Sequence, residues 1–186
     1  MADSNITKRA LASALKELIN EKPFGKISVS DICEKCDMNR KSFYYHFKDK
    51  YDLVNWIFDT EFIAIVNKKI NYTGWDFLNE LCNYLYINKD FYRKALKIEG
   101  QNSFKEHFRE LLQSVIAEQL KGILNNTEIQ DFHINFFTDG FVSAIGRWIA
   151  DKECANPREF LSLLKSCINQ TAIKVYNEID AEKQKE

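Results

Sequence analysis

The sequence predicts an all-α protein. Its 186 residues include only 6 Gly and 2 Pro, which is few turn-forming residues for an all-β fold. Apolar residues recur at three- and four-residue spacing through most of the chain, and residues that favour helix starts precede several of these stretches. With 45% hydrophobic and 13% aromatic residues, the chain can bury a substantial core. We expect about nine helices joined by short polar connections.

The first two helices have clear boundaries. Residues 5–21 place their apolar side chains on one face, which is typical of an amphipathic helix, and Pro23 and Gly25 end it. Ser28 then favours the start of a short helix, because its hydroxyl can accept from a free backbone N–H of the first turn. Asp31, three residues on, completes a capping box.

A third helix follows after a short turn. Asn39 is a good N-cap, and only residues 36–38 separate this helix from the second one. Such a tight turn requires one residue at positive φ, and Asp37 tolerates that conformation better than most residues. Two short helices joined in this way form the outline of a helix-turn-helix motif.

The rest of the chain predicts a helical body. Asp49 caps a long helix whose apolar stripe consists of Leu53, Val54, Ile57, Phe58 and Ile65. Further helices are expected at about 75–88, 90–98, 104–123, 128–151 and 157–183. We therefore expect two domains, a helix-turn-helix domain at 1–48 and a helical domain at 49–186.

Charge divides the chain in the same way. Residues 1–50 hold ten Lys/Arg and seven Asp/Glu, a net charge of +3. Residues 51–186 hold 16 Lys/Arg and 20 Asp/Glu, a net charge of −4. A basic head on an acidic body indicates a nucleic-acid partner for the head.

The third helix presents side chains suited to double-stranded DNA. Arg pairs with guanine, Asn with adenine and Ser with either, and recognition helices use such residues near their N-terminus. The aromatic and basic residues behind them can donate to phosphate oxygens. An isolated basic tetrapeptide is usually a solvated turn, but here the charge asymmetry, the turn and the caps agree. The predicted DNA-contact residues are Ser28, Ser30, Asn39, Arg40, Lys41, Ser42, Tyr44, Tyr45, His46 and Lys50.

Residues 27–53, "ISVSDICEKCDMNRKSFYYHFKDKYDL", resemble the DNA-binding segment of the TetR family of bacterial regulators. The resemblance implies base contacts by Arg40, Lys41, Ser42 and Tyr45, and phosphate contacts by Tyr44, His46 and Lys50. It also implies a helical body that binds a ligand and dimerises through its last two helices. The polar N-terminal stretch and the scattered cysteines separately indicate a soluble cytoplasmic protein. Asp37 departs from the family pattern, which has Gly in the turn.

Cys33 and Cys36 replace two small alanines of the family pattern and form a C-x-x-C. A zinc site needs four ligands, and the sequence has no second Cys pair. A redox dithiol favours a helix N-terminus, whereas this pair lies at the end of the second helix. We expect reduced thiols that pack between helices and no bound metal or cofactor. Thiol-based sensing is the alternative.

Residues 91–104, "FYRKALKIEGQNSF", resemble a TetR subgroup that includes regulators of dihydroxyacetone kinase genes. Some members of that subgroup act as activators through a partner protein. The candidate ligand-pocket residues are Tyr84, Tyr92, Gln101, Asn102, Phe136 and Phe137. The alternative is that Asn102 only caps the following helix and that the aromatic residues are ordinary core.

The resemblance places the dimer interface on the last two helices. Gly140 and Ala144, four residues apart, leave a strip that permits close helix contact, and Trp148 supplies a large apolar anchor. A dimer also suits the predicted DNA site, because two short recognition helices on symmetric half-sites bind more tightly than one.

Two other classes of protein fit poorly. His107 and His133 are isolated, and no H-E-x-x-H motif or Gly-rich phosphate loop is present, so we expect no enzymatic activity. No apolar run reaches the length of a membrane span. The expected function is a ligand-responsive repressor that binds a palindromic operator as a homodimer and is released by an unknown small-molecule effector. The alternative is an activator or co-regulator that works through a partner protein.

Overall fold

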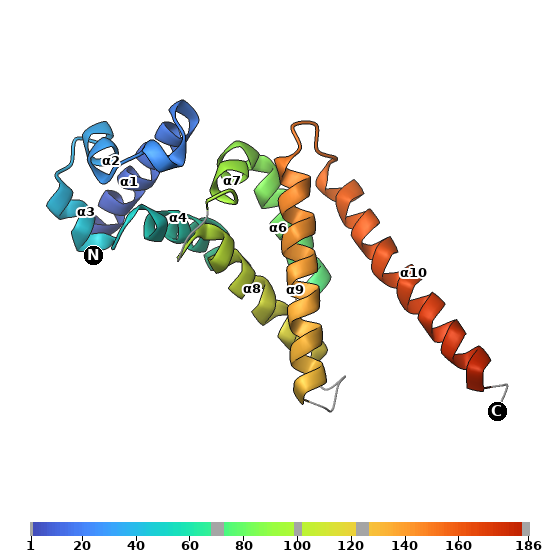
Figure 1. Cartoon of the computed structure of the whole chain (residues 1–186). Helices are drawn as coiled ribbons and strands as arrows, with labels where there is room; N and C mark the ends of the chain where they lie inside the picture. The colour runs from blue at the N-terminus through green and yellow to red at the C-terminus, as the bar shows by residue number, and fades with distance from the viewer. Residues whose placement is uncertain (1, 68–72, 99–101, 122–126, 184–186) are drawn as a thin grey trace.

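The computed structural model describes residues 2–67, 73–98, 102–121 and 127–183, and within these ranges the protein is helical with no strand (Figure 1). The all-α prediction is confirmed. The helices are α1 (Ala2–Glu21), α2 (Val29–Lys35), α3 (Arg40–His46), α4 (Lys50–Phe58), α5 (Ala64–Val66), α6 (Gly74–Ile87), α7 (Lys89–Ala95), α8 (Phe104–Leu120), α9 (Thr127–Ala150) and α10 (Pro157–Lys183). A 3-10 turn, η1 (Phe24–Lys26), precedes α2, and a π-helical turn, η2 (Asp59–Ile63), follows α4.

The N-terminal head consists of α1, α2 and α3. Its centre is apolar and fully buried, with Leu15, Ile32 and Phe43 each 0% exposed. Phe43 and Phe47 are four residues apart and anchor α3 to this centre, with ring centroids 5.7 Å apart. Helix α4 then leads from the head into the body (Figure 1). The predicted domain boundary at 48/49 falls between α3 and α4.

The body surrounds a cluster of aromatic rings. Phe58, at the end of α4, contacts Tyr84 on α6, Tyr92 on α7 and Phe104 on α8, with centroid separations of 5.2–6.0 Å. Helices α8 and α9 pack closely along one side of the body. Helix α10 packs on α6 near its start and then extends away from α9 (Figure 1).

The long helix expected after Asp49 contains an irregularity that the sequence pattern missed. Residues 59–63 form a π-helical turn, in which hydrogen bonds join residues five apart instead of four. The wider turn contains one extra residue, so the residues after it that face the core are shifted by one position from those that a regular α-helix would bury. Phe62 and Val66 are buried, whereas Ile65, which we assigned to the apolar stripe, is 58% exposed. That assignment was wrong.

None of the helices in the described ranges is both long enough and apolar enough to cross a membrane.

Candidate nucleic-acid interface

The turn between α2 and α3 has the predicted geometry. Asp37 adopts φ 53°, so an aspartate occupies the left-handed position that glycine takes at lower cost. The Met38 N–H donates to the Cys33 carbonyl at 2.8 Å and closes the turn. The Asn39 side-chain oxygen then accepts from the Ser42 N–H at 2.8 Å, which starts α3 as expected.

The start of α2 is fixed by the capping box. The Asp31 N–H donates to the Ser28 hydroxyl, and the Asp31 carboxylate accepts from the Ser28 N–H at 2.7 Å. Lys22 lies 2.9 Å from the same carboxylate. The Ser28 N–H, and then the Lys22 ammonium, lower the pKa of Asp31 to about 2. The Ser28 hydroxyl also donates to the Asp31 carboxylate, so the one O–H hydrogen of Ser28 is already used in the cap.

The exposed face of α3 presents four of the predicted DNA-contact residues. Arg40 and Lys41 are exposed at the first turn of the helix. Tyr44 and Tyr45 follow, 51% and 82% exposed. The Arg40 guanidinium lies over the Tyr44 ring, 5.8 Å from its centroid, and is oriented by this contact. The tyrosine hydroxyls and the two cations can donate hydrogen bonds to base edges and to phosphate oxygens.

Four other predicted residues are only partly available. The Ser42 hydroxyl donates to the Asn39 side-chain oxygen at 3.2 Å, so both side chains belong to the cap. The Asn39 amide nitrogen takes no part in that cap. His46 is half-buried, with its ring against Tyr45 at 4.9 Å. Ser30, in the first turn of α2, is also half-buried.

Lys50 has a role that the sequence did not indicate. Its ammonium donates to the Phe24 carbonyl at 2.8 Å and to the Ile27 carbonyl at 2.7 Å, and it lies over the Phe24 ring. Burial lowers the pKa of Lys50. The structure does not support the predicted phosphate contact, because this ammonium holds the η1 turn to α4 inside the head.

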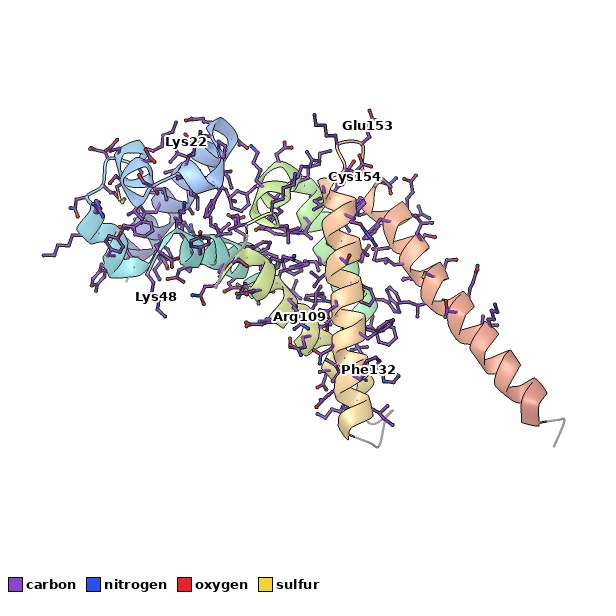
Figure 2. The ribbon with its side chains drawn as sticks, in the orientation of Figure 1. Lys22, Lys48, Arg109, Phe132, Glu153 and Cys154 are labelled. Atoms are coloured by element: carbon purple, nitrogen blue, oxygen red, sulfur yellow. The ribbon has the colours of Figure 1, made fainter. Side chains whose placement is uncertain are left out.

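Lys48 is the cation that sequence reasoning omitted. It is exposed immediately after α3, and its backbone N–H donates to the Asp52 carboxylate at 2.9 Å (Figure 2). This bond fixes the backbone and leaves the ammonium directed to solvent. The family pattern directed attention to Lys50, whereas a preference for the lysine nearest the end of α3 would have selected Lys48.

Cys33 and Cys36 pack as predicted. Cys33 is 2% exposed, and the Cys36 thiol donates to the Ile32 carbonyl at 3.2 Å. Burial raises the pKa of both thiols, which disfavours the reactive thiolate. No cluster of three or more potential metal ligands occurs among the residues described.

The predicted ligand-pocket residues do not line one cavity. The Tyr84 and Tyr92 hydroxyls are 2.6 Å apart, and their rings fill the body centre. Asn102 adopts φ 62° before α8, whereas Ser103 provides the N-cap, so the capping role considered for Asn102 was wrong. Gln101 lies outside the described residues. Phe136 is 64% exposed on α9, which rules out its assignment to an enclosed pocket of the single chain.

Phe137 does line a cavity. About 230 Å³ of mostly apolar space lies between α6, α8, α9 and α10, and its lining includes Trp75, Val115, Phe137 and Phe141. A larger groove of about 690 Å³ lies between α7, α8 and α9. Lys97, Lys105 and Arg147 are among its lining residues.

The predicted dimer-interface residues are divided between two environments. Gly140 is exposed, and nothing lies within 4 Å of the position that a Cβ would take. Ala144 is half-buried against the body. Trp148 is 7% exposed, stacks on Phe160 with centroids 4.5 Å apart and donates to the Ala155 carbonyl. Trp148 therefore joins α9 to α10 within one chain, and little of its surface is left to contact a second subunit.

Exposed apolar side chains on α9 and α10 were not predicted. Phe132 is 70% exposed near the lower end of α9 and stacks against Phe136 (Figure 2). On α10, Leu163 is 67% exposed and Ile173 is 60% exposed. The four-residue spacing of Phe132 and Phe136 was visible in the sequence, but the sequence alone did not distinguish an exposed face from a buried one.

Two family models match the chain. The model for bacterial regulatory proteins of the tetR family matches residues 11–57, which include the helix-turn-helix. A second, for the C-terminal region of transcriptional regulators of the TetR type, matches residues 74–170. The chain belongs to the TetR family and is a transcriptional regulator.

Individual relatives agree with this result. The chain is 34% identical over 164 residues to the HTH-type dhaKLM operon transcriptional activator DhaS of Lactococcus lactis subsp. lactis (strain IL1403), covering 86% of this chain and 81% of that protein. The structure of a dihydroxyacetone kinase operon activator, DhaS, superposes with a TM-score of 0.63 at 24% identity, over 90% of this chain and 97% of that one. A TetR regulator from Streptococcus agalactiae 2603V superposes with a TM-score of 0.68 at 20% identity, over 87% and 93%. The two structures show the same fold.

Proposed function

We propose that the protein is a homodimer that reads a palindromic DNA operator with α3. The observation that carries this proposal is the exposed face of α3, where Arg40, Lys41, Tyr44 and Tyr45 project from a helix held by an intact turn and two caps. Lys48 adds a phosphate contact beside this face. One face of this kind gives modest affinity, and two faces on symmetric half-sites give an operator-binding protein.

The DNA proposal is tested by selecting bound fragments from DNA that flanks the gene and then measuring affinity for the selected sequence. The wild type should bind one sequence with steep salt dependence, because phosphate contacts release counterions. Arg40→Ala should lose sequence preference and Lys48→Ala should weaken binding to all sequences alike. Lys152→Ala, at an exposed lysine after α9 and away from the head, is the matched control. Equal binding by all four proteins contradicts the proposal.

Exposed apolar side chains on the last two helices, Phe132 and Phe136 on α9 and Leu163 and Ile173 on α10, support the dimer. Several large apolar side chains exposed on the surface are the usual mark of an interface. In a homodimer the same face of each subunit meets its copy. Phe132→Glu should shift the protein from dimer to monomer in sedimentation velocity. Tyr45→Glu places the same charge at an exposed aromatic of the head and should leave the dimer intact.

The direction of regulation has two candidates. The family resemblance favours a repressor released by a small molecule, whereas the relative at 34% identity is described as an operon activator. The activator reading also suits a body whose centre is filled by Tyr84 and Tyr92. A reporter driven by the selected operator decides between them: deletion of the gene raises expression for a repressor and lowers it for an activator.

The cavity of about 230 Å³ beside Phe137 is the place that we propose for a small apolar effector. Its lining joins α8, α9 and α10, so an occupant would contact both the body and the proposed dimer helices. Thermal-shift measurements with a panel of small metabolites test this assignment. A stabilising compound whose effect is lost in Phe137→Ala supports it, and a compound whose effect is unchanged by that substitution contradicts it.

A further inference from the structure

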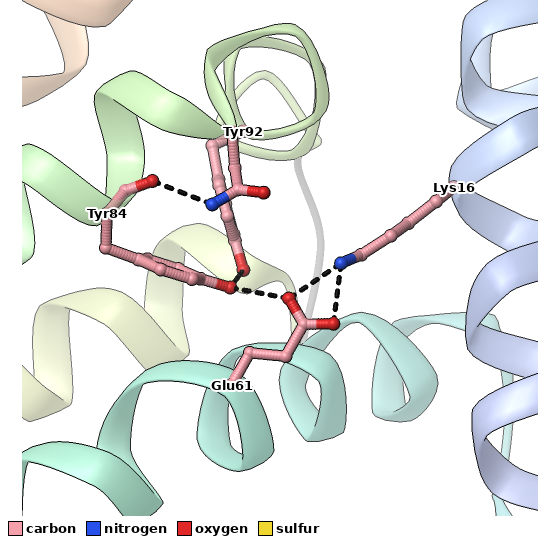
Figure 3. Close-up of polar contacts among 5 residues, drawn as sticks. Lys16, Glu61, Tyr84 and Tyr92 are labelled. Atoms are coloured by element: carbon pink, nitrogen blue, oxygen red, sulfur yellow. Dashed lines mark hydrogen bonds and ion pairs between the residues drawn. The ribbon is translucent and has the colours of Figure 1, made fainter.

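A chain of four polar side chains connects the head to the body. Lys16, on α1, places its ammonium 2.6 Å from each carboxylate oxygen of Glu61 in η2 (Figure 3). The same carboxylate accepts from the Tyr84 hydroxyl of α6 at 3.0 Å. The Tyr84 hydroxyl is in turn 2.6 Å from the Tyr92 hydroxyl of α7. Three elements, α1, η2 and α6, therefore meet at one carboxylate, and α7 joins them through Tyr84.

The protons in this chain can be placed. Tyr84 has one O–H hydrogen, and it is directed to Glu61, so the short contact between the tyrosines requires Tyr92 to donate to Tyr84. Burial raises the pKa of both tyrosines, which keeps both hydroxyls protonated. Glu61 is thus the final acceptor for a tyrosine chain from the body and for an ammonium from the head.

The carboxylate of Glu61 lies in the irregular turn. Residues 59–63 form the π-helical segment, and such segments are frequent at functional sites. In the same turn, Asp59 contacts His107 of α8 at 2.7 Å. The turn is therefore held by α6 and α8 from the body while it holds α1 of the head.

Few other polar contacts fix α1 on the body. Within the described residues, the Lys94 ammonium of α7 donates to the Ile19 carbonyl at 2.7 Å, near the C-terminal end of α1. A cavity of about 350 Å³, with Ser13, Lys16 and Glu61 in its lining, lies beside the ion pair. This space leaves room beside the ion pair on the side of α1 that faces η2.

We propose that Glu61 is a positioning residue that sets the angle of the head on the body, and through it the half-site spacing that the dimer selects. This inference rests on the proposed function. The recognition helix α3 packs on α1, so a rotation of α1 moves α3 by the same angle. In a dimer, that rotation changes the separation of the two recognition helices, which has to match successive turns of the major groove.

The alternative interpretation is that Lys16 and Glu61 form an ordinary surface ion pair. Their side chains are 31% and 38% exposed, and such pairs contribute little to stability. The two interpretations differ in what they predict for DNA selectivity. A surface pair has no influence on half-site spacing, whereas a positioning residue does.

The test uses the full-length protein and a set of palindromes in which the half-site spacing varies one base pair at a time. The wild type should show one optimal spacing. Glu61→Gln keeps the shape of the side chain and removes its charge, and it should reduce the preference for the optimum over neighbouring spacings by about tenfold. Lys16→Glu combined with Glu61→Lys restores an ion pair and should recover much of the preference. Glu118→Gln breaks an exposed pair with Lys121 far from the head and serves as the matched control.

A second readout separates this proposal from the DNA-binding proposal. Amide hydrogen exchange of the free protein should be faster in α1 for Glu61→Gln than for the wild type or Glu118→Gln. If the wild type binds no DNA but α1 shows this faster exchange, the operator proposal fails and the head–body contact stands. A spacing preference in Glu61→Gln equal to that of the wild type overturns the positioning role.

Discussion

The exposed face of α3 and the aromatic centre of the body use the same residue types for opposite purposes. Tyr45 is 82% exposed on α3 and has few neighbours that fix it, whereas Tyr92 is 0% exposed and contacts four other aromatic rings. A side chain of the first kind is free to bind, and one of the second kind maintains the fold. The position of a tyrosine in the structure, not its chemistry, decides which role it has.

This difference predicts that substitutions in the two regions separate stability from DNA binding. In the body centre the removal of a ring leaves a cavity that neighbouring rings cannot fill. On α3 the removal of an exposed side chain leaves the packing unchanged but removes a partner for DNA.

Phe58→Ala should destabilise the protein by about 3–5 kcal/mol, because the ring is fully buried at the centre of the aromatic cluster. Urea denaturation followed by circular dichroism measures the change. Tyr45→Ala is the matched control on α3 and should change stability by less than about 0.5 kcal/mol. Comparable losses for both variants would remove the distinction between the two regions.

Arg40→Ala should weaken binding to the selected operator by about 1–3 kcal/mol, which is the usual loss for one specific base contact. The thermal unfolding midpoint should be unchanged, because Arg40 is exposed and its ring contact with Tyr44 is a surface contact. Fluorescence anisotropy and a thermal scan of the same preparation test both parts. A lowered midpoint would show that Arg40 maintains the head and does not only read DNA.

Asp37→Gly should stabilise the head, and Asp37→Ala should destabilise it, each by about 1 kcal/mol. Glycine adopts the left-handed backbone at φ 53° freely, whereas alanine keeps the Cβ of aspartate and lacks the short polar side chain that favours this conformation. Denaturation midpoints of the two variants, compared at equal concentration, measure the effects. A loss of stability in Asp37→Gly as well would show that the Asp37 side chain stabilises the turn by more than its backbone costs.

His107→Gln should have a small effect that depends on pH. The hydrogen bond to Asp59 raises the pKa of His107 above its ordinary value, and the nearby Glu110 carboxylate acts in the same direction. Stability from this pair is therefore fully present below the unfolded pKa of about 6.5 and is lost as the pH rises through the folded-state value. Thermal midpoints of both proteins at pH 5.5 and pH 8.5 should differ more at the lower pH. A constant difference would contradict the charged pair.

The sequence predicted features that depend on neighbours along the chain. The capping box at Ser28, the cap at Asn39 and the positive φ of Asp37 follow from residues three or four positions apart, and all three are confirmed. The burial of Cys33 followed from the same local pattern. The exposed residues of α3 were predictable for the same reason.

Features that depend on distant parts of the chain were not predictable. Lys50 looks like a phosphate-binding lysine until the fold brings two carbonyls 23 and 26 residues away to its ammonium. Trp148 looks like an interface anchor until Phe160 stacks on it. The π-helical turn that positions Glu61 has no local signal, because packing against several helices maintains it.

The most direct test of the central claim is the affinity of the wild type and of Arg40→Ala for the selected palindrome and for a single half-site, measured by anisotropy at several salt concentrations. We expect the wild type to bind the palindrome at least tenfold more tightly than the half-site, with steep salt dependence, and Arg40→Ala to lose most of that advantage while it remains folded. Equal affinity of the wild type for both DNAs, or an undiminished preference in Arg40→Ala, would contradict a dimer that reads DNA through α3.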